Sequence, residues 1–385
     1  MDSHKFKKYF FKYFVPIILF FIISTSFFYG WILDSTKPQG GKGWADQTLY
    51  TRTAITFAHY ELPKKIHYQV GYPLLGALGY YISPDDPFMP ISYILLVSSF
   101  FLLYFGANNK FKTPFLLLFL LMVFYWDLHA RSLHYPSELF FIPWNNQVVF
   151  FIFCYYFWLF NYCEDKRIPI WFIIITAFLS GYSIATREEI IFFILPLAIS
   201  FLVVKKCNYK IFILFFGFFF IGYLPQLFIK YKVLGDILST GREDETKGVG
   251  YISKLVTYFS LKDLLFNSID IVFDSSIRKL ENIRRSSILQ SNPWLWLTPF
   301  GIFYTFYKKD EKNMIRVYTI ISLCLFLFYL AGENMSAHKL KYHCIRYITP
   351  SYIAFNFVIV SLFQFLYEKY WEKISKHFLL NFQSM

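Results

Sequence analysis

Long apolar blocks separated by short polar segments set the pattern of this chain. The blocks run for roughly 18 to 22 residues, the length that an α-helix needs to cross about 30 Å of hydrocarbon. Backbone N–H and C=O groups find no water partner in hydrocarbon, so each block must bond them internally as a helix. The pattern predicts spans at residues 14–33, 88–107, 113–127, 145–163, 168–185, 189–204, 210–230, 293–307, 315–332 and 347–367. We therefore expect an all-α polytopic membrane protein with about ten transmembrane helices, forming a single transmembrane domain over residues 1–385.

The connections between these blocks alternate in character. The short basic ones, with the basic N-terminus and the C-terminal tail, share one side of the membrane; they are residues 108–112, 164–167, 205–210, 308–316 and 368–385. The positive-inside rule places that side, and therefore both termini, in the cytoplasm. Outside lie two long loops, 34–87 and 231–292, and two shorter polar segments, 127–146 and 332–346. The first apolar run is too long for a typical signal peptide and lacks an A-x-A site near its end, so we expect it to remain as a span.

Both long outer loops carry helical signals. In the first loop, apolar residues repeat at helical spacing at Tyr50, Ala54, Phe57 and Ala58. In the late loop, one face would hold Ile269, Val272, Phe273, Ile277, Leu280 and Ile283, opposite a charged face of Asp270, Asp274, Arg278, Glu281 and Arg285. Amphipathic helices of this kind lie flat at a membrane surface. The sequence therefore predicts surface helices in the first and the late external loop.

Composition agrees with a membrane protein. Hydrophobic residues make up 56% of the chain and charged residues only 16%, whereas soluble domains carry about 25% charged residues. The formal net charge of +13 could point to nucleic acid, but the basic residues cluster beside the apolar blocks as topology signals do. The five cysteines form no framework. We expect membrane lipid around the chain, no nucleic-acid partner and no disulfide.

The first external loop carries a candidate acid–base group. Residues 40–50 read GGKGWADQTLY, so a glycine-rich run is followed by a carboxylate at the start of the predicted surface helix. Helical spacing puts Asp46 and Tyr50 on one face. A carboxylate at a helix start is also favoured by the helix dipole, so Asp46 could be a plain N-cap. Further along, Gly71-Tyr72-Pro73 marks a turn before a second short apolar helix.

Other ionisable groups gather in the remaining outer segments. The candidate substrate contacts are Arg131, Glu138, Arg187, His338, Lys341, Arg346 and Tyr347. Arginine suits a phosphate held by two hydrogen bonds, although separate interface anchors would explain the same residues. The pairs His129/His134 and His338/His343 are each five residues apart, off the spacing for one helix face, so metal binding is conceivable but no metal or other cofactor is expected.

An ordered set of short motifs resembles one enzyme family. Asp46 with the D-Q-x-x-Y pattern and the following Gly71-Tyr72-Pro73-Leu74-Leu75 look like the first loop of the GT-C superfamily of membrane glycosyltransferases, closest to the protein-mannosyltransferase and aminoarabinose-transferase type. The segment Ala185 to Glu189 resembles that group's T-R-P-E segment, with Glu188 in place of proline. Arg346-Tyr347-Ile348-Thr349-Pro350 resembles its R-Y-x-x-P segment before the last span. All three motifs fall on the predicted outer face.

The resemblance implies an inverting sugar transferase that uses a polyprenyl-phosphate-linked donor. It would act at the outer face of a bacterial inner membrane, on a glycan, lipid or protein acceptor. The family's first-loop aspartate is its general base, a role that falls on Asp46 here. Arg187, Lys341 or Arg346 would stabilise the departing lipid phosphate. Gln47 stands where a second acid would favour a metal-dependent mode.

Two other classes fit parts of the pattern. An O-antigen-type polymerase or ligase would also have ten or more spans, lipid-linked substrates and an arginine-containing late loop, here with Arg242, Arg278, Arg284 and Arg285. The essential group separates the two readings: a first-loop acid in a transferase, the late-loop arginines in a polymerase. A transporter would need ionisable residues near span centres, and the predicted spans hold almost none.

Overall fold

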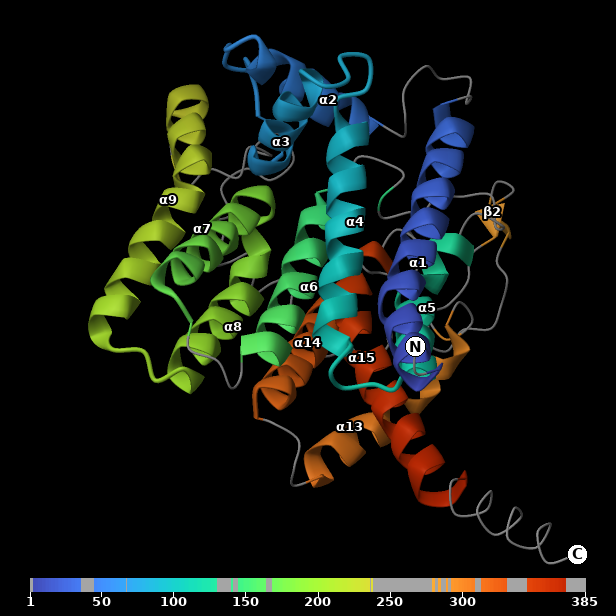
Figure 1. Ribbon diagram of the computed structural model, residues 1–385. Helices are drawn as coiled ribbons and strands as arrows, with labels where there is room; N and C mark the ends of the chain where they lie inside the picture. The colour runs from blue at the N-terminus through green and yellow to red at the C-terminus, as the bar shows by residue number, and fades with distance from the viewer. Residues whose placement is uncertain are drawn as a thin grey trace, which may run out of the picture.

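Helices dominate the computed structural model of the chain (Figure 1). It describes residues 3–35, 45–66, 68–129, 140, 145–163, 168–235, 237, 279–280, 283–284, 289, 292–308, 313–330 and 345–371. Every predicted span coincides with a helix in these ranges. The helices are α1 (Ser3–Ser35), α4 (Phe88–Ala107), α5 (Thr113–His129), α6 (Asn146–Cys163), α7 (Ile170–Thr186), α8 (Ile191–Val204), α9 (Tyr209–Leu234), α13 (Thr298–Tyr307), α14 (Asn313–Leu330) and α15 (Ile345–Leu366). Short 3-10 turns precede α8 (η2, Glu188–Ile190) and α13 (η4, Pro293–Leu297), and a π-turn, η6 (Tyr367–Trp371), extends α15.

The helices form a bundle in which α15 packs against α5, α6, α13 and α14, while α4 packs on α6 and α7 on α9. Small residues allow the closest approach. A Cβ atom added to Gly181 of α7 would lie 1.8 Å from the carbonyl oxygen of Phe219, and one added to Gly222 of α9 would lie 2.3 Å from that of Phe178. Such glycine contacts are typical of helices packed in a membrane, where van der Waals contact drives association.

Much of the outer surface of the bundle is apolar. Phe21, Ile213 and Phe303 are 62%, 69% and 71% exposed, respectively. By length and composition, the segments Phe88–Ala107, Tyr209–Leu234 and Tyr347–Tyr370 are long and apolar enough to cross a membrane, and shorter apolar helices lie at Pro16–Trp31, Thr113–Phe124, Ile170–Thr186 and Met314–Leu330. An apolar exterior of this kind suits a helical bundle surrounded by hydrocarbon. The number of crossings, ten, stays a prediction.

The first loop forms two helices at one end of the bundle (Figure 1). They are α2 (Ala45–Ala58) and α3 (Gly71–Tyr80), and the predicted apolar face of α2 is buried at Tyr50, Ala54 and Ala58. The helix predicted in the first loop is therefore present, and its position at a membrane surface stays a prediction. Gly71 begins α3 itself, so Gly71-Tyr72-Pro73 is the first turn of a helix and not a turn before one. The start of α1 and the end of α15 lie away from α2 and α3, as they must if both termini share the opposite side (Figure 1).

The late loop differs from the prediction. Strands β1 (Lys279–Leu280) and β2 (Ile283–Arg284) pair antiparallel, with Leu280 opposite Ile283. The predicted surface helix is therefore wrong at Lys279–Leu280 and Ile283–Arg284, and the other residues of that helix lie outside the described part. Two residues, Glu281-Asn282, separate the strands, and a two-residue connection containing asparagine favours a hairpin over a continuous helix.

Candidate functional site

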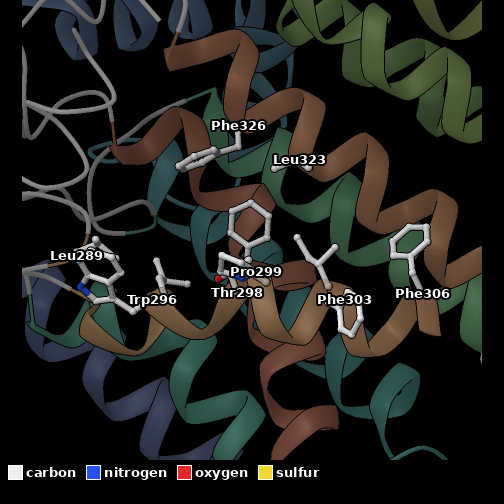
Figure 2. A pocket seen from close by; sticks show the side chains of 11 residues that line it. Leu289, Trp296, Thr298, Pro299, Phe303, Phe306, Leu323 and Phe326 are labelled. Carbon is white, nitrogen blue, oxygen red and sulfur yellow. The ribbon is translucent and has the colours of Figure 1, made fainter. Parts of the chain in front are cut away.

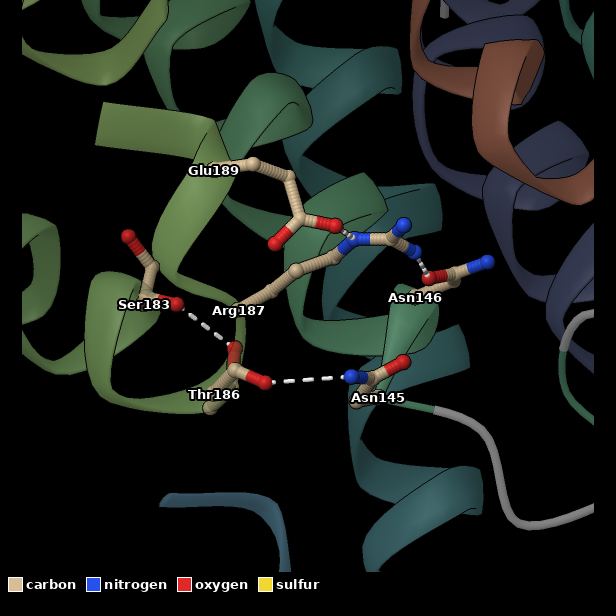
Figure 3. A network of polar contacts seen from close by, with 6 residues as sticks. All are labelled: Asn145, Asn146, Ser183, Thr186, Arg187 and Glu189. Atoms are coloured by element: carbon tan, nitrogen blue, oxygen red, sulfur yellow. Dashed lines mark hydrogen bonds and ion pairs between the residues drawn. The ribbon is translucent and has the colours of Figure 1, made fainter. Parts of the chain in front are cut away.

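The strongest cluster of charged side chains in the described residues centres on Arg187. This residue leaves α7 in an extended conformation, with φ −161° and ψ 104°, before η2 begins. The turn is fixed on both sides (Figure 3). The Thr186 hydroxyl donates to the Ser183 carbonyl at 2.6 Å, and Asn145 Nδ2 donates to the Thr186 carbonyl at 3.1 Å. The break in the helix therefore points one side chain inward from a rigid corner.

The guanidinium of Arg187 is buried and held on several sides. Its Nε donates to Glu189 Oε1 at 2.5 Å, and its Nη1 donates to Asn146 Oδ1. Its Cζ lies 4.2 Å from the ring centroid of Tyr347 and 5.4 Å from that of Tyr329, and these two rings stack at 5.5 Å. The structure thus brings together two predicted contacts, Arg187 and Tyr347. With the side chain only 8% exposed, Arg187 is not an anchor at the membrane interface.

The surroundings keep Arg187 charged. Burial by itself would lower the pKa of the guanidinium, but the Glu189 carboxylate and the rings of Tyr329 and Tyr347 raise that pKa above its ordinary value. A guanidinium has five N–H groups, and two of them make the bonds to Glu189 and Asn146. Nη2 has no hydrogen-bond partner among the described residues, and neither has the buried Nδ2 of Asn146. This corner therefore has hydrogen-bond donors left for an anionic or polar ligand.

A second buried ion pair lies directly beside the first. Lys230 of α9 is 4% exposed, and its Nζ bonds Oε1 of Glu188. The same oxygen accepts hydrogen bonds from Tyr223 Oη and Gln226 Nε2, both at 3.1 Å. In the sequence, Glu188 stood out only as a departure from a family motif. Lys230 was not predicted as a functional residue, because it reads as an ordinary basic residue at the end of an apolar span.

The first loop is attached to this charged corner at the start of α3. The backbone N–H of Val70 donates to Gln226 Oε1 at 2.7 Å, and Tyr182 Oη donates to the carbonyl of Gly71 at 2.6 Å. A Cβ atom at Gly71 would lie 2.7 Å from the backbone of Ala185, so only glycine allows this approach. The start of α3 therefore rests on the last turn of α7, immediately before Arg187.

Aromatic contacts extend the connection to α2. The ring of Tyr72 on α3 lies 5.4 Å from that of Tyr50, and its hydroxyl donates to Gln147 Oε1 at 3.1 Å. Gln147 follows Asn146, the partner of Arg187, at the start of α6. Asp46 lies in the first turn of α2, one helical turn before Tyr50. The helix that carries Asp46 is therefore packed at the Arg187 end of the bundle, although the Asp46 side chain lies outside the described part.

The remaining predicted contacts are only partly described. Arg346 lies in the first turn of α15, directly before Tyr347, and its side chain is outside the described part. Arg131, Glu138, His338 and Lys341 lie outside the described residues altogether. Within the described ranges, no three His, Cys, Asp or Glu side chains gather where they could hold a metal ion.

An apolar cavity of about 680 Å³ opens between η4, α13, α14 and α15 (Figure 2). Its walls include Trp296, Ile302, Phe303, Leu323, Phe326 and Phe355. None of the described residues that line it is ionisable, and the polar groups of their side chains are the Thr298 hydroxyl and the Trp296 indole N–H. The cavity therefore suits a hydrocarbon chain and cannot itself supply acid–base chemistry.

Comparison with known proteins supports the fold. No protein-family model matches the chain, and no curated protein sequence matches it. Among solved structures, the chain is similar to the crystal structure of ArnT from Cupriavidus metallidurans bound to undecaprenyl phosphate, with a TM-score of 0.57 and 12% sequence identity. The match covers 90% of this chain and 59% of the ArnT chain. The chain thus has the helical fold of a polytopic membrane protein and resembles the GT-C fold.

Proposed function

We propose that this protein is an inverting glycosyltransferase that moves a sugar from a polyprenyl-phosphate carrier to a glycan, lipid or protein acceptor. The observation that carries the proposal is the buried Arg187 corner, which holds a permanent cation, and donors without a partner among the described residues, beside the helix of Asp46. The similarity to ArnT supports it at the level of the fold. We place the reaction at the outer face of a bacterial inner membrane, with both termini in the cytoplasm.

In this reaction, Asp46 acts as the general base. It takes the proton from the acceptor hydroxyl while that oxygen bonds to the anomeric carbon of the donor sugar. The bond from the same carbon to the phosphate oxygen breaks, and its electron pair leaves with the lipid phosphate. Single displacement inverts the anomeric carbon.

The departing phosphate gains negative charge, which fixed cations stabilise. Arg187 supplies Nη2 for this purpose, and Asn146 supplies Nδ2 next to it. Because Arg187 pairs with Glu189 and Lys230 with Glu188, the four charges of the corner sum to zero. Further positive charge is therefore needed, and we assign it to Arg131, Lys341 and Arg346. Tyr347 orients the Arg187 guanidinium, while Glu138 and His338 contact the sugars.

The apolar cavity at α13 to α15 accommodates part of the carrier's prenyl chain. Phe326 of its lining lies three residues before Tyr329, the residue that faces Arg187. At 1.5 Å per residue this is a separation of about 5 Å along α14. A lipid whose phosphate lies at Arg187 therefore has apolar surface close by for its chain. ArnT was crystallised with a lipid of this class, undecaprenyl phosphate.

The variant Asp46→Asn tests the proposal. In isolated membranes supplied with a polyprenyl-phosphate-linked sugar, this change should lower transfer about 100-fold or more, because general-base catalysis contributes a factor of this order. Asp85→Asn, an exposed first-loop carboxylate, is the matched control and should keep full activity. Undiminished transfer by a well-inserted Asp46→Asn variant would exclude Asp46 as the base. If Arg284→Gln abolished activity instead, the polymerase or ligase class would take its place.

A further inference from the structure

We infer that the buried Lys230–Glu188 pair is a positioning device that sets the spacing between the first loop and the Arg187 corner. The inference rests on the proposed function, in which Asp46 is the base and Arg187 binds the phosphate, so that the distance between them affects the rate of transfer. Neither Lys230 nor Glu188 would touch the reacting atoms. The pair would act through Gln226 and through the start of α3.

Lys230 is buried although the next two residues of α9 are exposed. Its flanking residue Tyr231 is 59% exposed and Lys232 is exposed as well, yet Lys230 is 4% exposed. A buried ammonium is costly unless it is paired. Glu188 is the one carboxylate within ion-pair distance of Lys230 among the residues that the structure describes. A basic residue that merely marked the end of a span would be exposed to water or to lipid headgroups, and Lys232 is exposed whereas Lys230 is not.

Glu188 fixes the orientation of Gln226. A carboxylate only accepts hydrogen bonds, so the Gln226 amide must turn its Nε2 toward Glu188. Its Oε1 is then left facing the N–H of Val70, from which it accepts at 2.7 Å. A flipped amide would place like groups opposite each other at both contacts. The charge of Glu188 thus selects the one Gln226 orientation that ties down the first loop.

From Val70 the linkage reaches both sides of the proposed reaction. On one side, α3 packs through Tyr72 on Tyr50, one turn from Asp46. On the other side, Glu188 directly follows Arg187, and Gly71 packs on Ala185 two residues before Arg187. Breaking the hydrogen bonds that Glu188 accepts would therefore shift the proposed base, Asp46, relative to the proposed phosphate-binding residue, Arg187. A misplacement of about 1 Å at a reacting centre can cost a factor of about 100 in rate.

The test compares three variants at this pair with one control. Gln226→Met deletes the bridge to Val70 and leaves the ion pair intact, whereas Lys230→Met removes the cation. Both should lower kcat for sugar transfer between about 10- and 100-fold, while KM for the donor changes less than about threefold and the pH profile keeps its shape. Lys230→Arg keeps the charge and should retain most of the activity. Lys232→Met, on the exposed side of the same helix, should behave as the wild type.

A kcat that is unchanged per folded molecule in Gln226→Met and Lys230→Met would show a purely structural pair and overturn the inference. A pH profile that moves in Lys230→Met would overturn it as well, since Lys230 or Glu188 would then take part in proton transfer.

A readout without catalysis separates this inference from the proposed function. Spin labels at Arg52→Cys on α2 and Tyr231→Cys on α9, in a background without the native cysteines, report the spacing of the first loop and the corner by pulsed electron resonance. The distance distribution should be narrow with Lys230 and broad or shifted with Lys230→Met. If the distribution is identical in both, the inference fails even for an active transferase. If it changes but the wild type transfers no sugar from a polyprenyl-phosphate donor, the linkage stands and the proposed function fails.

Discussion

Glu189 and a donor phosphate compete for the same edge of the Arg187 guanidinium. Glu189 Oε1 lies 2.5 Å from Nε, while Nη2 has no hydrogen-bond partner in the part of the chain that the structure describes. An arginine binds a phosphate best through two parallel N–H groups, and on this edge those are Nε and Nη2. A phosphate that takes this edge must displace the carboxylate. We therefore predict that Glu189→Gln binds polyprenyl phosphate more tightly than the wild type.

The magnitude follows from the geometry. At an effective dielectric constant near 20, two unit charges 2.5 Å apart attract by about 6–7 kcal/mol. The Glu189 side chain is 29% exposed, which screens this attraction, and glutamine keeps an oxygen that accepts from Nε. The variant should therefore lose only about 2 kcal/mol of folding stability, less than the 3–5 kcal/mol typical when a buried pair is broken outright. Without the competing charge, the Kd for polyprenyl phosphate should fall about tenfold, or about 1.4 kcal/mol.

Thermal unfolding in detergent, with and without polyprenyl phosphate, measures both effects. The unliganded variant should melt below the wild type, and the stabilisation by a given lipid concentration should be larger. Glu368→Gln, which removes an exposed partner of Lys112 in another ion pair, is the control and should change neither quantity. Weaker or unchanged lipid binding by a folded Glu189→Gln variant would refute the assignment of Arg187 to the phosphate.

Three further predictions concern the same architecture. Arg187→Lys should raise the KM for the donor at least about tenfold in steady-state transfer assays. A lysine cannot bond Glu189 and Asn146 while stacking on Tyr347. An unchanged KM would contradict this prediction. Gly71→Ala should reduce transfer, since its Cβ would meet the backbone of Ala185 at 2.7 Å, whereas Gly217→Ala has open space and should have full activity. Ile302→Trp fills the apolar cavity and should slow transfer from long-chain donors more than transfer from short-chain donors. Phe300→Trp, on the exposed side of α13, is the control and should not have this effect. If Ile302→Trp slowed transfer equally for all chain lengths, the cavity would not be the binding site of the chain.

The helices were predictable because membrane spans are encoded locally. Length and hydropathy alone place a helix at each apolar block, and the spacing of Tyr50, Ala54 and Ala58 was sufficient for α2. Boundaries were less accurate: α1 already begins at Ser3, whereas the predicted span begins at residue 14. The late-loop prediction failed at Lys279–Leu280 and Ile283–Arg284 because helical spacing of apolar residues does not exclude two paired strands with a short connecting sequence that contains asparagine.

The candidate site was predictable only in its residue types. Arg187 and Tyr347 stood out in short motifs, but the burial of Arg187 depends on Asn146 of α6, Tyr329 of α14 and Tyr347 of α15. No local pattern reveals which helices surround a given side chain. Lys230 illustrates the limit, since a lysine at the end of an apolar block has the same sequence signature whether it faces lipid headgroups or a buried carboxylate.

The charge balance of the corner has a consequence for the reaction. Arg187 pairs with Glu189 and Lys230 with Glu188, so these four side chains together carry no net charge. Without Glu189, the buried guanidinium of Arg187 would be an unpaired charge, which is costly. Arg187 can remain buried without donor because Glu189 neutralises it, and it can bind phosphate because Glu189 is the more exposed and thus more easily displaced partner. The side chains of Lys230 and Glu188 are only 5% and 12% exposed, so this ion pair stays intact while phosphate replaces Glu189 at Arg187. The Arg187–Glu189 pair is thus suited to exchange Glu189 for a phosphate. The Lys230–Glu188 pair is suited to keep the surrounding helices in place during that exchange.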